Sequence, residues 1–326
     1  MYRVAVIGAG IISGSHLAAL ATMEQCQAAA VADLDPGKAQ VMAETYGIPA
    51  YTDYKQMIQE VKPDIAVITL PHFLHLEAAV YCAQQGCHLL LEKPMALNTQ
   101  QCDEIIAAAS KHNVRLMVAH TQHYLPVNLQ AKKLLARHNL GELVMIQEVR
   151  HKYYFNAERP QWFLEKDKSG GGIIMNLGSH SVDKIQWLTG AAVTKVKAGL
   201  SFHGGRGDVE GSGLIYMETS LGVPVTICQS GYPGAAREET EFIFTGGMIK
   251  LQTGKGLWIS ENDRYREVEV EAYDAPQVLQ FKELIAAIDE QREPECGGVY
   301  AREIINVIES IYKSHELGSE VAVTEQ

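Results

Sequence analysis

The sequence predicts an α/β domain built on a parallel sheet, followed by an α+β domain with an antiparallel sheet. Three observations predict this fold. The first 120 residues alternate short apolar runs with helical patterns, which is typical of a parallel sheet covered on both faces. A glycine-rich turn directly follows the first apolar run. After residue 120, longer strand-like runs are separated by glycine-containing turns, as in antiparallel sheets.

The first domain, residues 1–120, alternates strands with helices throughout. We expect strands at residues 3–7, 28–32, 64–69, 88–91 and 114–119. We expect helices near residues 14–24, 36–46, 74–85 and 99–112. Asn98, three residues before Gln101, is expected to cap the last of these helices.

The second domain, residues 121–326, has a different pattern of predicted elements, with longer strand-like runs and fewer helices. The segment 127–141 predicts one helix closed by a glycine. Strands are then expected at residues 142–155, 213–220, 223–230, 240–245 and 265–271. Two helices, at about 277–291 and 299–317, complete the chain. The sequence contains no internal repeat and no low-complexity linker.

Composition excludes several classes of protein. The 326 residues carry 28 Lys and Arg against 39 Asp and Glu, a net charge of −11 without any basic run, so we expect no nucleic-acid partner. No apolar run reaches the roughly 18–20 residues that span a bilayer, so we expect no membrane partner. The opening "MYRVAVIGAGIISG" reads as a strand and turn rather than a signal peptide. The six cysteines form no C-x-x-C pair, which favours a reduced, cytoplasmic protein without a metal site.

The stretch "VAVIGAGIISG" carries the first chemical motif. Gly8 and Gly10 follow a strand and open a helix, the context that a dinucleotide-binding turn requires. Gly8 allows the tight turn, Gly10 allows the backbone to approach a pyrophosphate, and the helix start supplies N–H groups. Ser13 stands where a third glycine is usual. The alternative is an ordinary glycine turn.

Asp33 ends the second predicted strand, 23 residues after Gly10. A carboxylate at this position can hydrogen-bond a ribose diol and would repel a 2′-phosphate, which favours NAD over NADP. The alternative is a cap for the helix that begins at Pro36, and Asp35 competes with Asp33 for the cofactor role.

The run "LLLEKPMALN" ends a predicted strand in a charged pair. Strand carboxyl ends in an open α/β sheet face the ligand crevice, so Lys93 would lie beside a nicotinamide. Glu92 would hold Lys93 or touch the cofactor. The alternative is an ion pair at the end of a strand.

A helical pattern within residues 169–190 follows three glycines and places Asn176 and His180 on one face, a turn apart. Histidine, with an ordinary pKa of about 6.5, suits proton transfer near neutrality. The glycines suggest close approach by a ligand or by another backbone. The alternative for His180 is a core or surface histidine without a catalytic role.

In this order, the motifs resemble the Gfo/Idh/MocA family of nicotinamide-dependent oxidoreductases. The resemblance includes the glycine turn, "PHFLH…GCHLLLEKP", "ELVMIQEV", "GGGIIMNLGSHSVD" and the closing "QFKELIAAIDEQREP…AREIINVIESIYKSHELG", and it covers nearly the whole chain. It implies an N-terminal Rossmann domain with a doubly wound parallel sheet and a C-terminal α+β domain. The second domain would have a large, open, mostly antiparallel sheet, which often forms an oligomer interface.

The resemblance also assigns roles to individual residues. Lys93 would contact the nicotinamide and the reacting oxygen, and His180 would be the general acid/base. Asn176 departs from the family, which usually has an aspartate there, and His123 stands where an arginine is common; no role is assigned to His123. The expected cofactor contacts are Gly8, Gly10, Ile11, Ile12, Asp33, Leu34, Thr69, His75, Glu92 and Lys93. His75 has an equal alternative, a histidine that packs locally at the start of a helix.

The substrate wall is expected in an aromatic segment, "HKYYFNAERPQWF". The candidates for substrate contact are Tyr124, Tyr153, Arg159 and Trp162. The equal alternative is aromatic packing at the end of a strand. Arg206, in a glycine-rich loop, is a further candidate for an anionic group.

The resulting hypothesis is an NAD-dependent dehydrogenase acting on a secondary alcohol of a sugar, cyclitol or related polyol. Lys93 would stabilise alkoxide charge while His180 accepts the hydroxyl proton. The rival hypotheses are a redox-neutral glycosidase that retains NAD and a non-catalytic regulator that senses the cofactor. A homodimer or homotetramer is expected.

Overall fold

The computed structural model describes residues 1–137 and 139–324. The chain divides into two compact units: unit 1 is Met1–Thr121 with Asp274–Glu303, and unit 2 is Gln122–Tyr273 with Ile304–Gln326. The sequence places residues 121–326 in a single second domain, whereas Asp274–Glu303 returns to unit 1. Within unit 1, Phe281 of this returning segment packs edge-on against His16, with 5.9 Å between the ring centroids.

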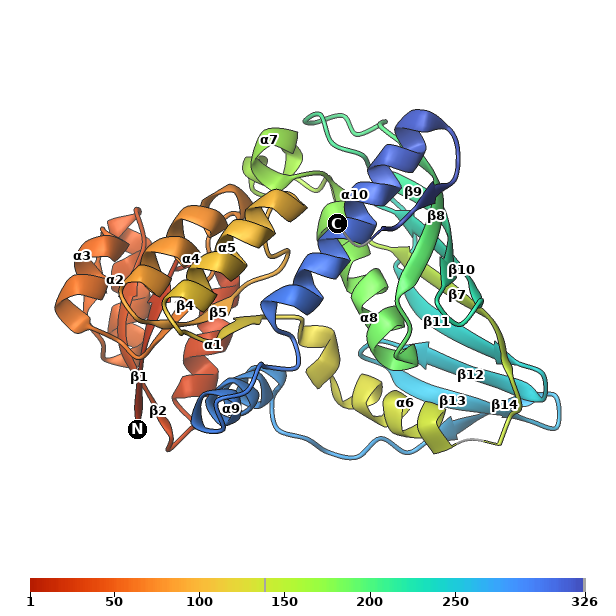
Figure 1. Ribbon diagram of the computed structural model, residues 1–326, viewed down its shortest axis with the longest axis horizontal. Helices are drawn as coiled ribbons and strands as arrows, with labels where there is room; N and C mark the ends of the chain where they lie inside the picture. Colours follow the sequence, from red (N-terminus) through yellow and green to blue (C-terminus); the bar gives the residue numbers. More distant parts are fainter. Residues whose placement is uncertain (138, 325–326) are drawn as a thin grey trace. The chain divides into compact units, whose positions relative to one another are not determined.

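Unit 1 is built on a parallel sheet, which we call the first sheet (Figure 1). Its strand order among the described residues is β3-β2-β1-β4-β5-β6, and each neighbouring pair is parallel. The strands are β1 (Tyr2–Ile7), β2 (Cys26–Ala32), β3 (Ala50–Tyr51), β4 (Ile65–Ile68), β5 (His88–Leu91) and β6 (Leu116–Val118). This is the doubly wound order of dinucleotide-binding folds, so the predicted Rossmann architecture is confirmed.

Helices pack on the first sheet and leave its strands buried. They are α1 (Ile11–Leu20), α2 (Pro36–Tyr46), α3 (Tyr54–Val61), η1 (His72–Leu74), α4 (His75–Gln84), α5 (Thr99–Lys111) and α9 (Pro276–Asp289). All four residues of β4 are buried, as expected of a strand covered on both faces. Asn98 caps α5 by accepting the Gln101 N–H at 2.9 Å, which confirms the predicted cap.

Helix α3 and strand β3 of unit 1 were not predicted from the sequence. Helix α3 buries only Met57, Ile58 and Val61 among polar neighbours, so its apolar pattern is short. Strand β3 has two residues at the edge of the sheet, too few to show a pattern. Helix α1 begins at Ile11 rather than at residue 14, since Gly10 is its N-cap.

Unit 2 is built on a larger sheet, which we call the second sheet. Its order among the described residues is β14-β13-β12-β11-β7-β10-β9-β8-β15, and neighbours are antiparallel except for the parallel pair β7 and β10. The strands are β7 (Leu143–His151), β8 (Val193–Ser201), β9 (Ser212–Thr219), β10 (Pro224–Ser230), β11 (Arg237–Phe244), β12 (Gly247–Gln252), β13 (Gly256–Glu261), β14 (Arg264–Val268) and β15 (Val321–Ala322). The large, mostly antiparallel sheet is therefore confirmed.

Strands β8, β12, β13 and β15 were not predicted from the sequence, and the predicted strand at residues 142–155 is longer than β7. Strand β8, "VTKVKAGLS", mixes lysine and glycine into its pattern, and β12 and β13 are short strands that each begin at a glycine. The chain leaves β7 after His151, and Tyr154 then donates its N–H to the Gly231 carbonyl at 2.8 Å.

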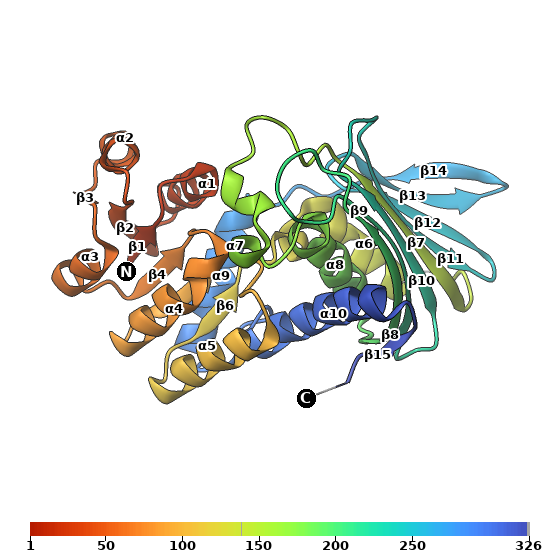
Figure 2. The ribbon, with the colours of Figure 1, turned by 90° about the horizontal axis from the view of Figure 1, so that it is seen from above.

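Helices cover one face of the second sheet (Figure 2). Besides α9, the helical segments after residue 120 are η2 (Thr121–Tyr124), α6 (Pro126–Arg137), η3 (Gln161–Leu164), α7 (Lys166–Ser169), η4 (Ile174–Gly178), α8 (Ser179–Thr189) and α10 (Gly298–Leu317). Figure 2 shows α6, α8 and α10 on the same side of this sheet, and residues of α10 from Ile304 onward belong to unit 2. Position 138 of the predicted helix 127–141 lies outside the described residues.

Burial along the strands distinguishes the two faces of the second sheet. In β9, Ile215 and Met217 are buried, whereas Leu214 is 64% exposed and Tyr216 is 39% exposed. The helix-covered face therefore forms the core of unit 2, and the other face is open.

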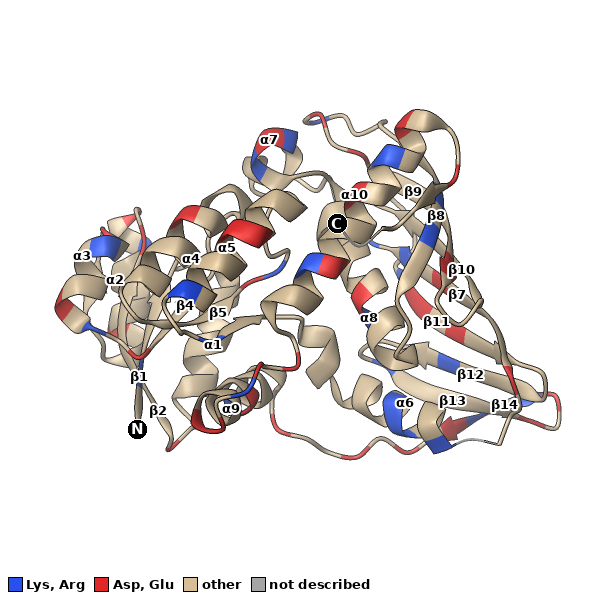
Figure 3. Ribbon diagram, in the orientation of Figure 1, with Lys and Arg blue, Asp and Glu red and all other residues tan. Residues whose placement is uncertain are grey.

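Positions of Lys and Arg alternate with positions of Asp and Glu along the ribbon of each unit (Figure 3). Among the described residues, no helix is long and apolar enough to cross a membrane.

Candidate active site

The turn between β1 and α1 is shaped by two glycines. Gly8 has a φ of +101°, and a Cβ there would lie 2.8 Å from both the carbonyl and the hydroxyl oxygen of Thr69. The Thr69 hydroxyl lies 3.1 Å from the Gly8 carbonyl oxygen, to which it donates. Gly10 caps α1, and a Cβ there would have no neighbouring protein atom within 4 Å. Ile11, the next residue, is 99% exposed, so this helix start is open to a pyrophosphate.

Asp33, at the end of β2, holds this turn. Its carboxylate accepts the N–H of Ala9 at 2.7 Å and the N–H of Asp35 at 2.8 Å. The cap of α2 is Asp35, which accepts the Gly37 N–H at 2.9 Å. The helix-capping alternative therefore applies to Asp35, and Asp33 remains the candidate for the ribose.

A pocket of about 380 Å³ opens beside Asp33. It is lined by Ile7, Ala32, Asp33, Leu34, Thr52, Asp53, Tyr54, Lys55, Leu70 and Glu77. Of its charged residues, Lys55 is bound to Glu77 at 2.7 Å, which leaves Asp33 and Asp53 in excess. Such a pocket repels a phosphate, and its size and position after β2 suit the adenosine half of a dinucleotide. Leu34 lines it and is 86% exposed.

The turn after β5 carries Glu92, Lys93 and Pro94, with a cis bond between the last two. The Glu92 carboxylate lies 3.0 Å from Nε2 of the buried His16 and also accepts the Lys93 N–H at 3.2 Å. Burial by itself would raise the pKa of Glu92, but the hydrogen bond and charge of His16, together with Lys93, hold that pKa below its ordinary value. Glu92 therefore fixes the turn that presents Lys93.

His75 holds the other side of this turn, which we call the Lys93 turn (residues 92–95). It is fully buried, with Nδ1 3.0 Å from the Pro94 carbonyl oxygen and 3.3 Å from that of Met95. Its Nε2 lies 2.8 Å from the Leu70 carbonyl oxygen. Burial lowers the pKa of His75, and these carbonyl contacts oppose the shift. Both nitrogens face protein carbonyls, which matches the local-packing alternative.

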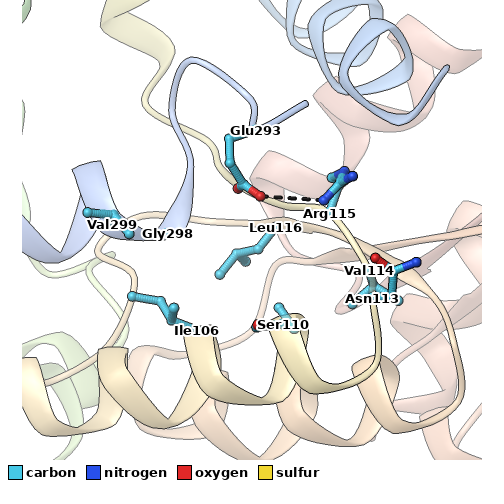
Figure 4. Close-up of a pocket in the computed structure, with 10 residues that line it drawn as sticks. Ile106, Ser110, Asn113, Val114, Arg115, Leu116, Glu293, Gly298 and Val299 are labelled. Carbon is cyan, nitrogen blue, oxygen red and sulfur yellow. Dashed lines mark hydrogen bonds and ion pairs between the residues drawn. The ribbon is translucent and has the colours of Figure 1, made fainter. Parts of the chain in front are cut away.

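A second pocket in unit 1, of about 360 Å³, lies away from these residues (Figure 4). It is lined by Ile106, Ala109, Ser110, Asn113, Val114, Arg115, Leu116, Glu293, Gly298 and Val299. Arg115 and Glu293 form an ion pair at 3.4 Å beside it. None of the residues predicted to bind cofactor or substrate lines this pocket, so size alone does not identify the active site.

In unit 2, three glycines precede the segment that carries Asn176 and His180. A Cβ on Gly171 would lie 2.0 Å from the Tyr312 hydroxyl oxygen, and one on Gly172 would lie 2.1 Å from the Glu210 carbonyl oxygen. Of the two explanations for the glycines, the structure supports close approach by other parts of the protein.

Asn176 and His180 lie on two consecutive helical segments. Asn176 is in η4, a π-helical turn of the kind that often marks functional sites. It is 7% exposed, and its amide donates to the Tyr154 hydroxyl at 3.5 Å. His180 is the second residue of α8 and is half-buried. Sequence reasoning predicted their shared helix but not the π turn.

Helix α8 is anchored to the second sheet by a buried ion pair. The Lys184 ammonium lies 2.9 Å from the Glu148 carboxylate of β7, and both side chains are fully buried. Ser181 donates to the other Glu148 oxygen at 2.8 Å, and Thr240 also donates to Glu148. Burial would raise the pKa of Glu148, but the charges of Lys184 and Arg150 hold it below its ordinary value.

A second buried pair lies further along the same helix. His123 Nε2 is 2.7 Å from the Asp183 carboxylate, and neither side chain is exposed. The His123 ring stacks on Trp187 with 4.5 Å between centroids. His123, which had no role predicted from the sequence, thus belongs to the contacts that fix α8.

The four predicted substrate residues differ in accessibility. Tyr124 is buried at 6% exposure, while Tyr153 is 46% exposed. Arg159 places its guanidinium 3.9 Å from the centre of the Tyr154 ring, and Trp162 stacks on its neighbour Phe163 at 3.7 Å.

Arg206 contacts the protein rather than a free anion. It donates to the Asn156 carbonyl at 2.8 Å and lies 3.3 Å from the Gln161 side-chain oxygen. The glycine-rich loop is thereby tied to the aromatic segment.

The sequence did not point to Glu148, Arg150, Tyr154 or Glu210, and the helical pattern within residues 169–190 included Lys184 without giving it a role. Alternation along β7 would have revealed two of them, since Glu148 and Arg150 share the inward face with Ile146. Glu210 gave no signal, because its partners lie 36 to 38 positions away in the chain. Among the described residues, no group of three or more His, Cys, Asp or Glu could hold a metal ion.

Comparison with protein families gives two matches. A model described as "Oxidoreductase family, NAD-binding Rossmann fold" matches residues 2–120, and one described as "GFO/IDH/MocA C-terminal domain" matches residues 128–250.

Individual relatives are more distant. The chain is 25% identical over 312 residues to the inositol 2-dehydrogenase/D-chiro-inositol 3-dehydrogenase of Lactiplantibacillus plantarum, covering 90% of this chain and 84% of the relative. It is 28% identical over 192 residues to the 2,7-anhydro-N-acetylneuraminate hydratase of Mediterraneibacter gnavus, covering 59% of this chain and 50% of that relative. The chain thus spans about half the length of this second relative.

Solved structures show the same fold. The aldose-aldose oxidoreductase from Caulobacter crescentus, complexed with glycerol, superposes with a TM-score of 0.91 at 23% identity. The match covers 98% of this chain and 99% of that one.

Proposed function

The chain belongs to the Gfo/Idh/MocA family of oxidoreductases, and we propose that it is an NAD-dependent dehydrogenase acting on a secondary alcohol of a sugar, cyclitol or related polyol. One observation supports this most directly. The glycine turn, Thr69 and the Lys93 turn follow β1, β4 and β5, which are adjacent parallel strands. All three therefore lie at the carboxyl ends of these strands, on the same side of the first sheet. Open α/β sheets bind nucleotides at the carboxyl ends of their strands.

The residues at these strand ends fit NAD. Gly10 leaves the start of α1 open for the pyrophosphate, and Asp33 borders a pocket large enough for the adenosine. When bound, NAD supplies the acceptor for a hydride. The excess of carboxylate around the pocket disfavours the 2′-phosphate of NADP.

Lys93 has the electrostatic role in this proposal. An ammonium group beside the reacting oxygen stabilises the negative charge that develops as the hydroxyl loses its proton. The ammonium is effective only when its position is fixed. His16, through Glu92, and His75, through Pro94, fix the backbone that presents it.

His180 has the proton-transfer role. A half-buried imidazole at the start of a firmly anchored helix can accept the hydroxyl proton and return it in the reverse direction. Asn176, bound to the Tyr154 hydroxyl, orients a substrate hydroxyl without adding charge. We assign substrate contact to Tyr153 first, since it is the most exposed of the four candidates.

The substrate class is supported by the relatives. One relative is named for inositol oxidation, and the solved structure with a TM-score of 0.91 is named for aldoses. The polar and aromatic side chains near Tyr153 suit a ligand with several hydroxyl groups and an apolar ring face.

A panel of sugars and cyclitols, each offered with NAD and with NADP, tests the proposal through the absorbance of the reduced nicotinamide. We expect turnover of at least one polyol with NAD preferred. A clear preference for NADP would contradict the role of Asp33, and no turnover with either cofactor would contradict the dehydrogenase function.

A redox-neutral reaction with retained NAD is the second candidate, because one relative is named as a hydratase. It predicts product formation without added NAD and without net reduction of the cofactor. Chromatography of the same reaction mixtures separates the two candidates. A regulator without catalysis would need neither Lys93 nor His180.

We also propose that the protein forms a homodimer or homotetramer through the open face of the second sheet. Leu214, Tyr216 and Met145 are exposed on this sheet, at 64%, 39% and 37%. Replacing Leu214 and Tyr216 by lysine would yield monomers in sedimentation if this is correct, and unchanged oligomers if another surface is used.

A further inference from the structure

Glu210 binds the start of the helical segment that carries Asn176 and His180. Its carboxylate accepts the Gly172 N–H, at 2.9 Å and 2.8 Å from its two oxygens, and the Ile174 N–H at 2.8 Å. Its backbone carbonyl accepts the intervening Ile173 N–H at 3.2 Å. Three consecutive backbone N–H groups therefore donate hydrogen bonds to one residue, Glu210.

These N–H groups are the ones that a helix cannot satisfy by itself. The first N–H groups of a helix have no partner within it, and they form the positive end of its dipole. A carboxylate is the strongest natural acceptor for them. Glu210 is 1% exposed, so water does not compete for these bonds.

Tyr312 completes the arrangement from α10. Its hydroxyl donates to the Glu210 carboxylate at 2.9 Å. The glycines are necessary for this contact, because side chains at Gly171 and Gly172 would overlap the Tyr312 hydroxyl and the Glu210 backbone. The glycine motif and the Glu210–Tyr312 pair thus form one structural unit.

The other end of the π turn is held from the sheet. Arg150 donates to the Leu177 carbonyl at 3.2 Å and also binds Glu238. Asn176 lies between Ile174 and Leu177, and His180 follows within one turn. The backbone on both sides of Asn176 is therefore bound to a buried charged side chain, Glu210 on one side and Arg150 on the other.

We propose that Glu210 is a positioning residue for Asn176 and His180, acting through the backbone N–H groups of Gly172 and Ile174. The inference rests on the proposed function, in which His180 transfers the proton. Glu210 does not act on the substrate itself. Its carboxylate sets where the π turn begins, and so where the imidazole lies relative to a bound alcohol.

The decisive variant is Glu210→Gln in the full chain. The glutamine amide has the same shape, but it would turn a donor toward the Gly172 N–H and carries no charge for the helix dipole. We expect faster amide hydrogen exchange over residues 172–178. We expect kcat to fall by about 10- to 100-fold, the usual effect of a small displacement of a reacting group. The KM for NAD should not change, because the proposed cofactor residues belong to unit 1.

Two further variants calibrate this result. Tyr312→Phe removes a single hydroxyl and should change exchange and kcat in the same direction by less, and it replaces Glu210→Gln if that variant does not fold. Glu261→Gln makes the same chemical change on β13, where Glu261 pairs with the exposed Arg266 at 2.7 Å, and should change neither quantity.

The outcomes separate the two proposals. Unchanged exchange over residues 172–178 would overturn the contact role of Glu210, and faster exchange with unchanged kcat would reduce that role to stability alone. If the unmodified protein oxidises no polyol of the panel, the proposed function fails. The exchange measurement then still decides whether Glu210 holds the turn.

Discussion

The Lys93 turn of unit 1 and the π turn of unit 2 present their reactive side chains in different ways. The Lys93 turn extends a strand of a parallel sheet, and two imidazoles, those of His16 and His75, contact it. The π turn is held at both ends by buried charged side chains, Glu210 and Arg150, which bind its backbone. The first arrangement uses the topology of the sheet, and the second depends on contacts between distant segments.

This difference has consequences for stability. His16 pairs with the Glu92 carboxylate, whereas the contacts of His75 with carbonyl groups contribute modestly, and the sheet itself keeps the Lys93 turn in place. A buried carboxylate is expensive to leave without its partner, so the contacts around α8 are sensitive to single substitutions. We therefore expect unit 2 to respond more strongly than unit 1 to substitutions that do not touch the substrate.

The largest effects should come from the two reactive side chains themselves. His180→Ala removes the proposed acid/base and should lower kcat by about 10²- to 10⁴-fold. Lys93→Ala should lower kcat by about 10²- to 10³-fold through lost charge stabilisation. Steady-state kinetics on the best polyol of the panel measures both. Full activity of either variant would remove that residue from the mechanism.

The next largest effect concerns the anchor of α8. Glu148→Gln leaves the buried Lys184 without its counter-charge and should lower the free energy of unfolding by about 3–5 kcal/mol. The matched control is Glu218→Gln, which breaks a partly exposed pair with Lys195 and should cost less than about 1 kcal/mol. Urea unfolding at neutral pH compares them, and equal effects would contradict the importance of burial.

The same pair predicts a pH dependence. The folded-state pKa of Glu148 lies below the ordinary value of 4.5, so its stabilising effect is fully present above that value. The effect is lost as the pH falls through the lower, folded-state pKa. The difference in stability between the unmodified protein and Glu148→Gln should therefore shrink below about pH 4.5. A difference that stays constant down to pH 3 would mean that Glu148 does not titrate with folding.

The smallest effect is expected at the Lys93 turn. His75→Leu removes the imidazole that contacts the Leu70 and Pro94 carbonyls and should lower stability by about 1–3 kcal/mol. It should also lower kcat, because Lys93 is part of the turn and moves when the turn moves. His203→Leu, at an exposed position of unit 2, is the control and should change neither. A loss as large as that of Glu148→Gln would show that the sheet alone does not hold this turn.

Much of unit 1 could be predicted from the sequence because its signals are local. Uniformly apolar runs gave the long parallel strands, and Asn98 and Gln101 gave the start of α5. The elements that escaped were short, such as β3. The candidate site residues Asp33 and Lys93 followed from their positions after strands.

Unit 2 was harder to predict because its decisive contacts are not local. Strand β8 lacks a clear alternation, β12 and β13 are short, and the parallel pairing of β7 with β10 cannot be read from either strand alone. The glycine motif was recognised as a place of close approach, but its partners, Glu210 and Tyr312, lie far along the chain.

The sequence by itself determined the fold class, the glycine turn and the strand-end lysine, because each depends on neighbours within a few residues. Only the tertiary structure decided what surrounds His180. Helix α8 is held by Glu148 from β7, and the π turn before it is held by Glu210 from a loop and by Tyr312 through Glu210. The physical reason is that a buried charge or an unpaired helix N–H specifies only that a partner must exist. Which residue supplies the partner is settled when distant segments pack together.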